Sequence, residues 1–391
     1  ILELKKLITL MKKIFYWSPY LSNVATIGNV LNSAYSLTKY DKKSFNVYIL
    51  DVIGEWENKK KEIEEKNLKY IKISGFNLKK NLPILGFLKS RIYSVIIFIF
   101  NIVPLFNLLK KDRPDFFIMH LLTSIPLILL LFFKFETKFI LRISGLPRLN
   151  FFRKLLWKIV NKKLFLITCP SRETLEYLIK LKIFDENRLA VLHDPIINVS
   201  KINKQIKKNL DQKELQKNFF LSIGRLTKQK NHLLMIKFFS ILKDKDLNFS
   251  LYILGDGEER NYLSKEIERL NLKDSVFLVG HKENVYPYIS LAKAVIIPSL
   301  WEDPGAVMIE AAFCNKIVIS SDCKSGPKEF LMNNRAGYLF DNNNLNSLYE
   351  ACTKFLKEDT KTIYSKKLLA KKNSKNYSIF SHHIQLKKLL N

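Results

Sequence analysis

Two glutamates eight positions apart lie on either side of a proline–glycine break. Glu302 and Glu310 belong to the run Ser-Leu-Trp-Glu-Asp-Pro-Gly-Ala-Val-Met-Ile-Glu. Residues 293–299, just before it, are typical of a buried parallel strand, and a helix is expected to begin at Pro304 because proline suits a first turn. Glu302 would then lie on the strand-to-helix loop, where open α/β sheets bind ligands. Glu310 would follow about two turns later.

The start of this helix is a candidate anion site. Gly305, Ala306 and Val307 would present backbone N–H groups that have no partner within the helix, and such groups favour a phosphate. Two glutamates at this spacing occur by chance in many chains of 391 residues. The interpretation therefore depends on the neighbouring segments.

Two cations follow an earlier predicted strand. Residues 219–223 are apolar, Gly224 makes the turn, and Arg225 and Lys230 come before the next helix. Both cations would stand at one strand end, where they suit the two phosphates of a diphosphate. The alternative is a pair of solvated cations on a lysine-rich surface.

Two further short strands end in glycine. Residues 250–254 are followed by Gly255-Asp-Gly257, and residues 276–280 close on Gly280. Gly255 either lets the backbone approach a ligand or only makes a turn. The sequence leaves both interpretations open.

Taken in order, these segments resemble the signature of the retaining glycosyltransferases of family 4, over about residues 219–340. The resemblance implies an α/β protein of GT-B architecture, with two Rossmann-like doubly wound domains facing across a cleft. It implies that Arg225 and Lys230 hold the diphosphate of a nucleoside diphosphate sugar. In the same comparison Glu310 accepts hydrogen bonds from the donor ribose and Glu302 contacts the donor sugar.

The activity implied by the resemblance is transfer of a hexose or N-acetylhexosamine, with retention, to a hydroxyl of a lipid-linked or cell-envelope glycan. The acceptor would belong to O-antigen, capsule or lipopolysaccharide biosynthesis, on a polyprenyl diphosphate carrier. No metal cofactor is expected, because the two cations and the helix N–H groups would stabilise the leaving diphosphate. The alternatives are a GT-B nucleotide-sugar epimerase and a non-enzymatic protein that binds polyanions.

Three residues of the first half are weaker candidates for substrate binding. Gly28 corresponds to a glycine-rich loop that approaches the donor phosphate in the family, although this chain has a single glycine there. His120 ends a predicted strand, and Arg148 follows another and suits an anionic acceptor. Many family members carry a histidine near the position of Ser144-Gly145, and this chain does not.

The length of 391 residues suits two domains. Strands and helices alternate over residues 11–197, which we expect to form an acceptor-binding Rossmann-like domain. Residues 198–217 have the composition of a linker, and residues 218–375 are expected to bind the nucleotide sugar. Residues 376–391 are expected to form a helix that crosses back to the first domain, as the resemblance implies.

The net charge is +29, from 65 basic and 36 acidic residues. Such a surplus attracts anionic lipid, polyanionic sugars or nucleic acid. Nucleic acid is the weakest of these partners, because no basic-aromatic array is visible. The codon usage of an AT-rich genome explains the many lysines equally well.

Residues 91–110 are the one membrane candidate, and they are expected to form a helix that lies in the core, on a membrane surface or across the membrane. Four cysteines lack metal-ligand spacing and suit reduced thiols. Met11 resembles a natural start, with residues 1–10 an extension outside the fold and no evident secretory signal. The expected location is therefore the cytoplasm, with the inner face of the cell membrane as a peripheral site.

Overall fold

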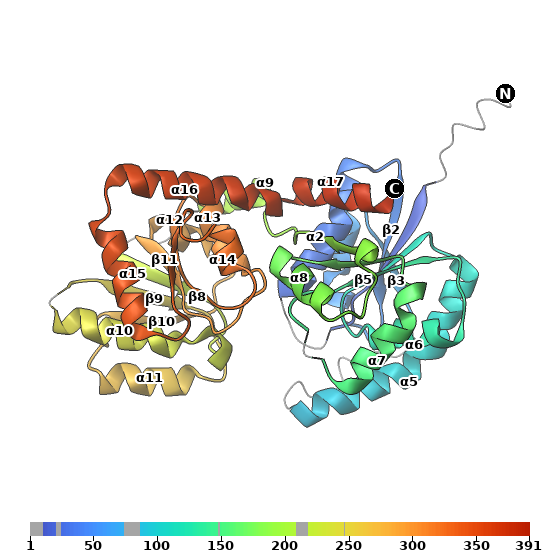
Figure 1. Ribbon diagram of the computed structural model, residues 1–391, viewed down its shortest axis with the longest axis horizontal. Coiled ribbons are helices and arrows are strands. Elements are labelled where there is room, and N and C mark those ends of the chain that lie inside the picture. The colour runs from blue at the N-terminus through green and yellow to red at the C-terminus, as the bar shows by residue number, and fades with distance from the viewer. Residues whose placement is uncertain (1–10, 21–24, 74–86, 148, 209–217, 246) are drawn as a thin grey trace. The chain divides into compact units, whose positions relative to one another are not determined.

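The chain forms two parallel-sheet units (Figure 1). The computed structural model describes residues 11–20, 25–73, 87–147, 149–208, 218–245 and 247–391. The first unit contains the residues up to Pro195 together with Ile379–Asn391, and the second is Ile196–Ser378. The extension 1–10 considered above lies outside the described residues.

The first unit has a seven-stranded sheet in the order β3-β2-β1-β4-β5-β6-β7, with every pair parallel. The order reverses between β1 and β4, so the carboxyl ends of these two strands form a topological switch point. The strands are β1 (Lys12–Trp17), β2 (Phe45–Asp51), β3 (Lys69–Lys72), β4 (Phe116–Met119), β5 (Lys138–Arg142), β6 (Leu166–Cys169) and β7 (Leu189–Val191).

Alternate strand residues enter two apolar cores, one on each face of this sheet. Phe15 and Trp17 of β1 belong to the core covered by α5, α6, α7 and α8, whereas Ile14 and Tyr16 belong to the core covered by α2 and α17. The helices are α2 (Ala25–Tyr40), α3 (Lys60–Glu65), α5 (Phe87–Asp112), α6 (Ser124–Phe132), α7 (Phe151–Val160), α8 (Arg172–Lys180) and α17 (Ile379–Leu390).

Helix α17 comes from the C-terminal end of the chain and packs against α2 in the first unit. The buried ring of His382 joins the two helices, since its Nε2 lies 2.8 Å from the Ser33 hydroxyl and its Nδ1 lies 2.6 Å from the His193 carbonyl oxygen. Burial lowers the pKa of His382 to about 3. The neutral ring therefore serves as a structural hydrogen-bonding group.

The second unit has a six-stranded parallel sheet in the order β10-β9-β8-β11-β12-β13. Its order reverses between β8 and β11. The strands are β8 (Phe219–Ile223), β9 (Ser250–Leu254), β10 (Val276–Gly280), β11 (Ala294–Ile297), β12 (Ile317–Ser321) and β13 (Tyr338–Phe340). The helices are α9 (Val199–Ile206), α10 (His232–Asp244), α11 (Arg260–Arg269), α12 (Tyr286–Leu291), α13 (Ala306–Phe313), α14 (Pro327–Phe330), α15 (Leu345–Lys357) and α16 (Thr360–Ser374).

Part of the expected linker 198–217 is helical. The Asn198 side chain caps α9 by accepting a hydrogen bond from the backbone N–H of Lys201, and Ile202 is buried against the second unit's core. One well-placed isoleucine and a cap offset the polar composition that indicated a linker. Residues 209–217 lie outside the described residues.

The membrane candidate 91–110 lies within α5, a helix of 26 residues. Ile97, Leu105 and Leu109 are buried in the first unit's core, whereas Val95, Ile99 and Val103 are exposed. Among the described residues, no helix combines the length and apolarity that crossing a bilayer requires. One face of α5 thus packs into the core, and the other exposes apolar side chains to solvent.

A buried pair of carboxyl groups, Asp51 and Glu55, lies at the end of β2 and in the turn that follows. The Glu55 carboxylate accepts hydrogen bonds from the backbone N–H groups of Val52 and Ile53, the latter at 2.7 Å, and the Tyr70 hydroxyl donates to Asp51. Burial, together with the hydrogen bond and negative charge of Asp51, raises the pKa of Glu55 well above its usual value. The folded protein therefore retains a proton on this pair that the unfolded chain releases.

We expect the stability of the Glu55→Gln variant, relative to that of the wild type, to increase as the pH rises. The folded-state pKa of Glu55 lies above its unfolded value of about 4.3, so this group's contribution to stability falls between those two values as pH increases. A glutamine oxygen can still accept the backbone hydrogen bonds without losing a proton. Thermal unfolding midpoints of both proteins at pH 5 and pH 8 measure the effect, and an equal difference at both pH values would contradict it.

Candidate functional site

An ion pair joins the two strand ends at the switch point of the second unit. The ammonium group of Lys230, in the turn after β8, contacts the carboxylate of Glu302, in the loop after β11. Their side chains are only 19% and 9% exposed. The Ser299 hydroxyl also donates to Glu302, at 2.7 Å. The sequence-predicted cation and carboxylate therefore meet at the place where parallel sheets bind ligands.

Glycines allow the backbones of the loops after β8 and β9 to approach each other closely. A Cβ atom on Gly255 would lie 1.9 Å from the carbonyl oxygen of Gly224, and one on Gly257 would lie 2.4 Å from that of Leu226. A Cβ atom on Gly224 would lie 3.2 Å from the Lys230 side chain. Gly224 and Gly255 thus have a packing role, and Gly224 leaves room for the aliphatic part of Lys230 to reach Glu302.

Hydrogen bonds to its backbone fix the loop that carries Glu302. The N–H of Leu300 donates to the carbonyl of Gln229 at 2.8 Å, and the Gln229 side chain donates to the carbonyl of Trp301 at 3.0 Å. The Ser321 hydroxyl donates to the Ser299 carbonyl at 2.5 Å. The turn with Lys230 and the loop with Glu302 therefore form one connected structure.

Helix α13 begins at Ala306, two residues later than the predicted start at Pro304. Gly305 is the N-cap and has a φ of 89°, a left-handed conformation that separates the proline from the helix. The carbonyl of Gly305 accepts from the N–H groups of Met308 and Ile309. The N–H groups of Ala306 and Val307 precede these in the first turn, where a helix supplies no internal acceptor for them. The anion site expected there stays a prediction.

Glu310 lies on α13 and contacts a residue that the sequence did not indicate. The Tyr286 hydroxyl, from the start of α12, donates a hydrogen bond to the Glu310 carboxylate at 2.8 Å. Burial raises the pKa of Glu310, and this hydrogen bond and the charge of Lys201 oppose that rise. A tyrosine at the start of a short helix before a buried strand gives no motif, so only the fold identifies Tyr286 as the partner of Glu310.

Arg225 is exposed directly after Gly224, on the same strand end as Lys230. Behind it lies the buried ring of His232, whose Nδ1 is 3.3 Å from the Ser222 hydroxyl. Burial, then the charge of Lys230, lowers the pKa of His232 to about 4. This neutral histidine packs beneath the two cations and adds no third positive charge.

The first-half candidates have different surroundings. Gly28 is exposed within α2, where an added Cβ atom would meet nothing within 4 Å, so the backbone does not require glycine there. His120 follows β4 at the first unit's switch point, where its N–H donates to the Trp17 carbonyl at 2.9 Å. Burial, then the charge of Arg142, lowers the pKa of His120 well below its usual value. Arg148 lies outside the described residues.

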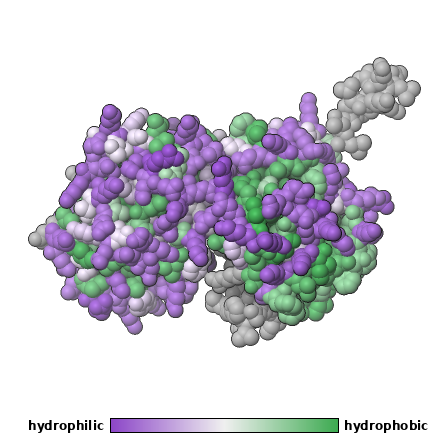
Figure 2. Space-filling view, viewed as in Figure 1, coloured by the Kyte–Doolittle hydropathy of each residue, from purple (hydrophilic) through white to green (hydrophobic). Residues whose placement is uncertain are grey.

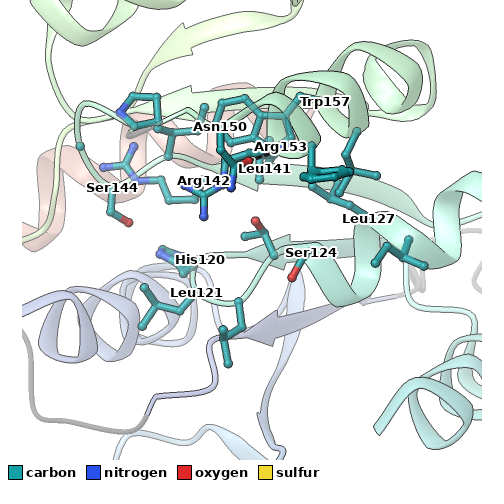
Figure 3. A pocket seen from close by; sticks show the side chains of 18 residues that line it. His120, Leu121, Ser124, Leu127, Leu141, Arg142, Ser144, Asn150, Arg153 and Trp157 are labelled. Carbon is teal, nitrogen blue, oxygen red and sulfur yellow. Dashed lines mark hydrogen bonds between the residues drawn. The ribbon is translucent and has the colours of Figure 1, made fainter. Parts of the chain in front are cut away.

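His120 borders a cavity of about 550 Å³ within the first unit. Figure 3 shows His120, Ser124 and Leu127 on one side of this cavity and Arg142, Ser144 and Trp157 on the other. The Arg142 guanidinium donates to Asp194 at 2.5 Å and to the Leu192 carbonyl at 2.7 Å, which fixes its place in the wall. The cavity is large enough for a small organic ligand.

Two parallel-sheet units of this kind define the GT-B fold class, which confirms the predicted class. Residues 203–377 match the family "glycosyl transferases group 1". The chain is similar to an uncharacterized glycosyltransferase of Methanocaldococcus jannaschii, with 31% identity over 66% of each chain. It is also similar to the Campylobacter jejuni N-acetylgalactosamine-N,N'-diacetylbacillosaminyl-diphospho-undecaprenol 4-alpha-N-acetylgalactosaminyltransferase, with 28% identity over 57% of this chain and 62% of that protein. The aligned residues thus span less than two thirds of either relative.

The fold is also that of Anabaena HepE, solved in complex with UDP, with a TM-score of 0.72 over 97% of this chain and 99% of that one at 16% identity. The match to the glycosyl transferases group 1 family lies within the second unit. The matched residues contain Arg225, Lys230, Glu302 and Glu310.

The Lys230–Glu302 pair should contribute measurably to the stability of the second unit. We expect the double-mutant cycle of Lys230→Met and Glu302→Gln to give a coupling energy of about 1–3 kcal/mol, because each group loses much of its hydration next to the other. Urea unfolding of the wild type, both single variants and the double variant measures it. The exposed pair Lys273–Glu268 is the control, with an expected coupling of about 0–1 kcal/mol. Equal coupling in the two cycles would disprove the contribution.

Proposed function

We propose that this protein is a retaining glycosyltransferase that uses a nucleoside diphosphate sugar. The observation that carries the proposal is the Lys230–Glu302 ion pair at the switch point of a family-matched unit, with the exposed Arg225 on the same strand end as Lys230. The UDP complex of HepE supports a uridine diphosphate sugar as the first donor to test. A hexose or an N-acetylhexosamine is the sugar we propose, and the names of the relatives support an N-acetylated one.

The donor pyrophosphate would bind between Arg225, Lys230 and the first N–H groups of α13. Without donor, Glu302 neutralises Lys230. A pyrophosphate would compete for the Lys230 ammonium group and would leave the Glu302 carboxylate available to accept a hydrogen bond from a sugar hydroxyl. Glu310, fixed by Tyr286, would accept hydrogen bonds from the ribose. Gly224, Gly255 and Gly305 would keep these loops close enough for one ligand to touch all of them.

In the reaction, the bond between the anomeric carbon and the diphosphate oxygen breaks and the acceptor hydroxyl bonds to the same face of the sugar. The proton of that hydroxyl passes to the departing phosphate oxygen, so no protein base is required. The leaving diphosphate gains negative charge, and Arg225, Lys230 and the N–H groups of Ala306 and Val307 stabilise it. These groups supply positive charge without a metal ion, so we propose a metal-independent enzyme.

The acceptor would be a hydroxyl of a lipid-linked or cell-envelope glycan. The diphospho-undecaprenol in the name of the Campylobacter relative and the poly(ribitol-phosphate) in that of a Staphylococcus aureus relative support this class. His120 would face the acceptor from the first unit as a neutral ring, because its pKa is lowered by burial. An acceptor of this kind favours a location at the inner face of the cell membrane.

Alanine substitutions at the donor site should abolish most of the transfer. We expect Arg225→Ala to lower the transfer rate roughly 100-fold, the usual scale for loss of a group that stabilises transition-state charge. Glu310→Ala should lower it to a similar extent, because the donor ribose is then no longer held in place. The measurement is release of UDP from a panel of UDP-sugars with and without acceptor glycans. Lys228→Ala is the matched control, because Lys228 is an exposed cation of the same turn and should be dispensable.

Near-normal turnover in Arg225→Ala and Glu310→Ala would contradict the assignment. A protein that binds neither UDP nor GDP would support the non-enzymatic alternative. Isomerised donor without transfer to any acceptor would indicate the epimerase.

A further inference from the structure

The first unit exposes two apolar stripes on neighbouring helices. On α7, Phe151, Leu155 and Ile159 are 73%, 45% and 54% exposed and recur every four residues, so they share one helix face. Val95, Ile99 and Val103 form an equally spaced stripe on α5. Helix α6 packs against both helices, and Figure 2 shows hydrophobic residues gathered over this part of the unit. Exposed apolar residues gathered in this way mark an interaction surface.

The charged residues of α7 itself are all basic. Arg153, Lys154 and Lys158 are exposed on the same helix as its apolar stripe. The sequence contains no acidic residue from Lys138 to Arg172, nor from Lys66 to Lys111, which includes most of α5. The connection between α6 and β5 has one acidic residue, Glu136, which pairs with Arg113 at 3.7 Å. Just after α7, Asp185 accepts a hydrogen bond from the Asn161 side chain at 3.0 Å. Phenylalanine and leucine beside lysines, without acidic residues, suit the interface of an anionic bilayer.

The cavity beside His120 shares its wall with α7. Phe152, Arg153, Leu156 and Trp157 line it from this helix, and Asn150, which caps α7 by accepting from the Arg153 N–H at 2.8 Å, lines it as well. Phe152 is 78% exposed. A ligand in the cavity would therefore lie directly beside the exposed face of α7.

We propose that the exposed faces of α7 and α5 dock on an anionic lipid bilayer, with α7 lying in the headgroup layer. Docking in this way sets the 550 Å³ cavity at the membrane surface. An acceptor anchored in the bilayer by a hydrocarbon chain then enters the cavity from the lipid side, its anionic group meeting Arg153 and its sugar approaching His120. The docking surface stands on its own observations, whereas the role of the cavity as an acceptor site depends on the proposed function.

Vesicle flotation tests the docking surface with the full chain. Vesicles of phosphatidylcholine with roughly a third phosphatidylglycerol should carry the protein at about 0.05 M salt, and pure phosphatidylcholine should carry much less. Phe151→Ser with Leu155→Ser should lower the bound fraction at least about tenfold, since two apolar side chains no longer enter the interface. Lys154→Glu with Lys158→Glu should lower it on anionic vesicles only.

Two double variants provide matched controls. Phe380→Ser with Ile384→Ser removes an equally spaced exposed apolar pair from α17 of the same unit, and Lys354→Glu with Lys357→Glu reverses two exposed cations of α15. Both should float like the wild type. UDP binding, measured in parallel by thermal stabilisation, should survive in all four variants. Three of them change the first unit, and the two lysines of α15 are not among the groups proposed to hold the donor.

The outcomes separate the two proposals. Flotation that the α7 variants abolish and the controls preserve supports the surface, even if UDP does not bind and the proposed function fails. UDP binding without flotation overturns the surface and leaves the proposed function standing. An equal loss of flotation in the apolar variants of α7 and α17 also overturns the docking surface. So does binding of a second protein, in place of lipid, to the exposed faces of α7 and α5.

Discussion

The structure of the candidate site depends on one constraint, the pairing of Lys230 with Glu302 across the point where the second sheet reverses its strand order. Each group follows a different strand, and a charge that is mostly buried is costly without its partner. The pair therefore holds a cation and an anion at the carboxyl ends of β8 and β11, where open parallel sheets bind ligands. In the proposed function, a donor pyrophosphate would replace Glu302 as the anionic partner of Lys230 and would leave the Glu302 carboxylate to accept a hydrogen bond from the sugar.

Close backbone packing makes that pairing possible. Gly224 and Gly255 meet at a distance that no other residue allows, and the hydrogen bonds of Gln229 hold the Glu302 loop against the Lys230 turn. The first unit is built differently at its own switch point, where a cavity and His120 replace the ion pair. The second unit thus has an ion pair at its switch point, and the first has a cavity of about 550 Å³ beside α7.

The alternation of strands and helices could be predicted because buried parallel strands are continuous apolar runs, as in Phe219–Ile223. The edge strands β3 and β13 were missed, since Lys69–Lys72 has charged ends and Tyr338–Phe340 has only three residues. Spacing and charge indicated Lys230 and Glu302 as ligand-binding residues, but not that they pair. Tyr286 was beyond prediction, because its contact with Glu310 joins two helices that only the fold brings together.

Calorimetric titration with UDP and with UMP measures most directly whether this pair of strand ends binds a pyrophosphate. The second phosphate of UDP would reach Arg225 and Lys230, so UDP should bind at least about tenfold more tightly than UMP, and Lys230→Met should remove most of that difference. Equal affinity for the two nucleotides, or a difference that survives Lys230→Met and Arg225→Ala together, would contradict the proposed donor site.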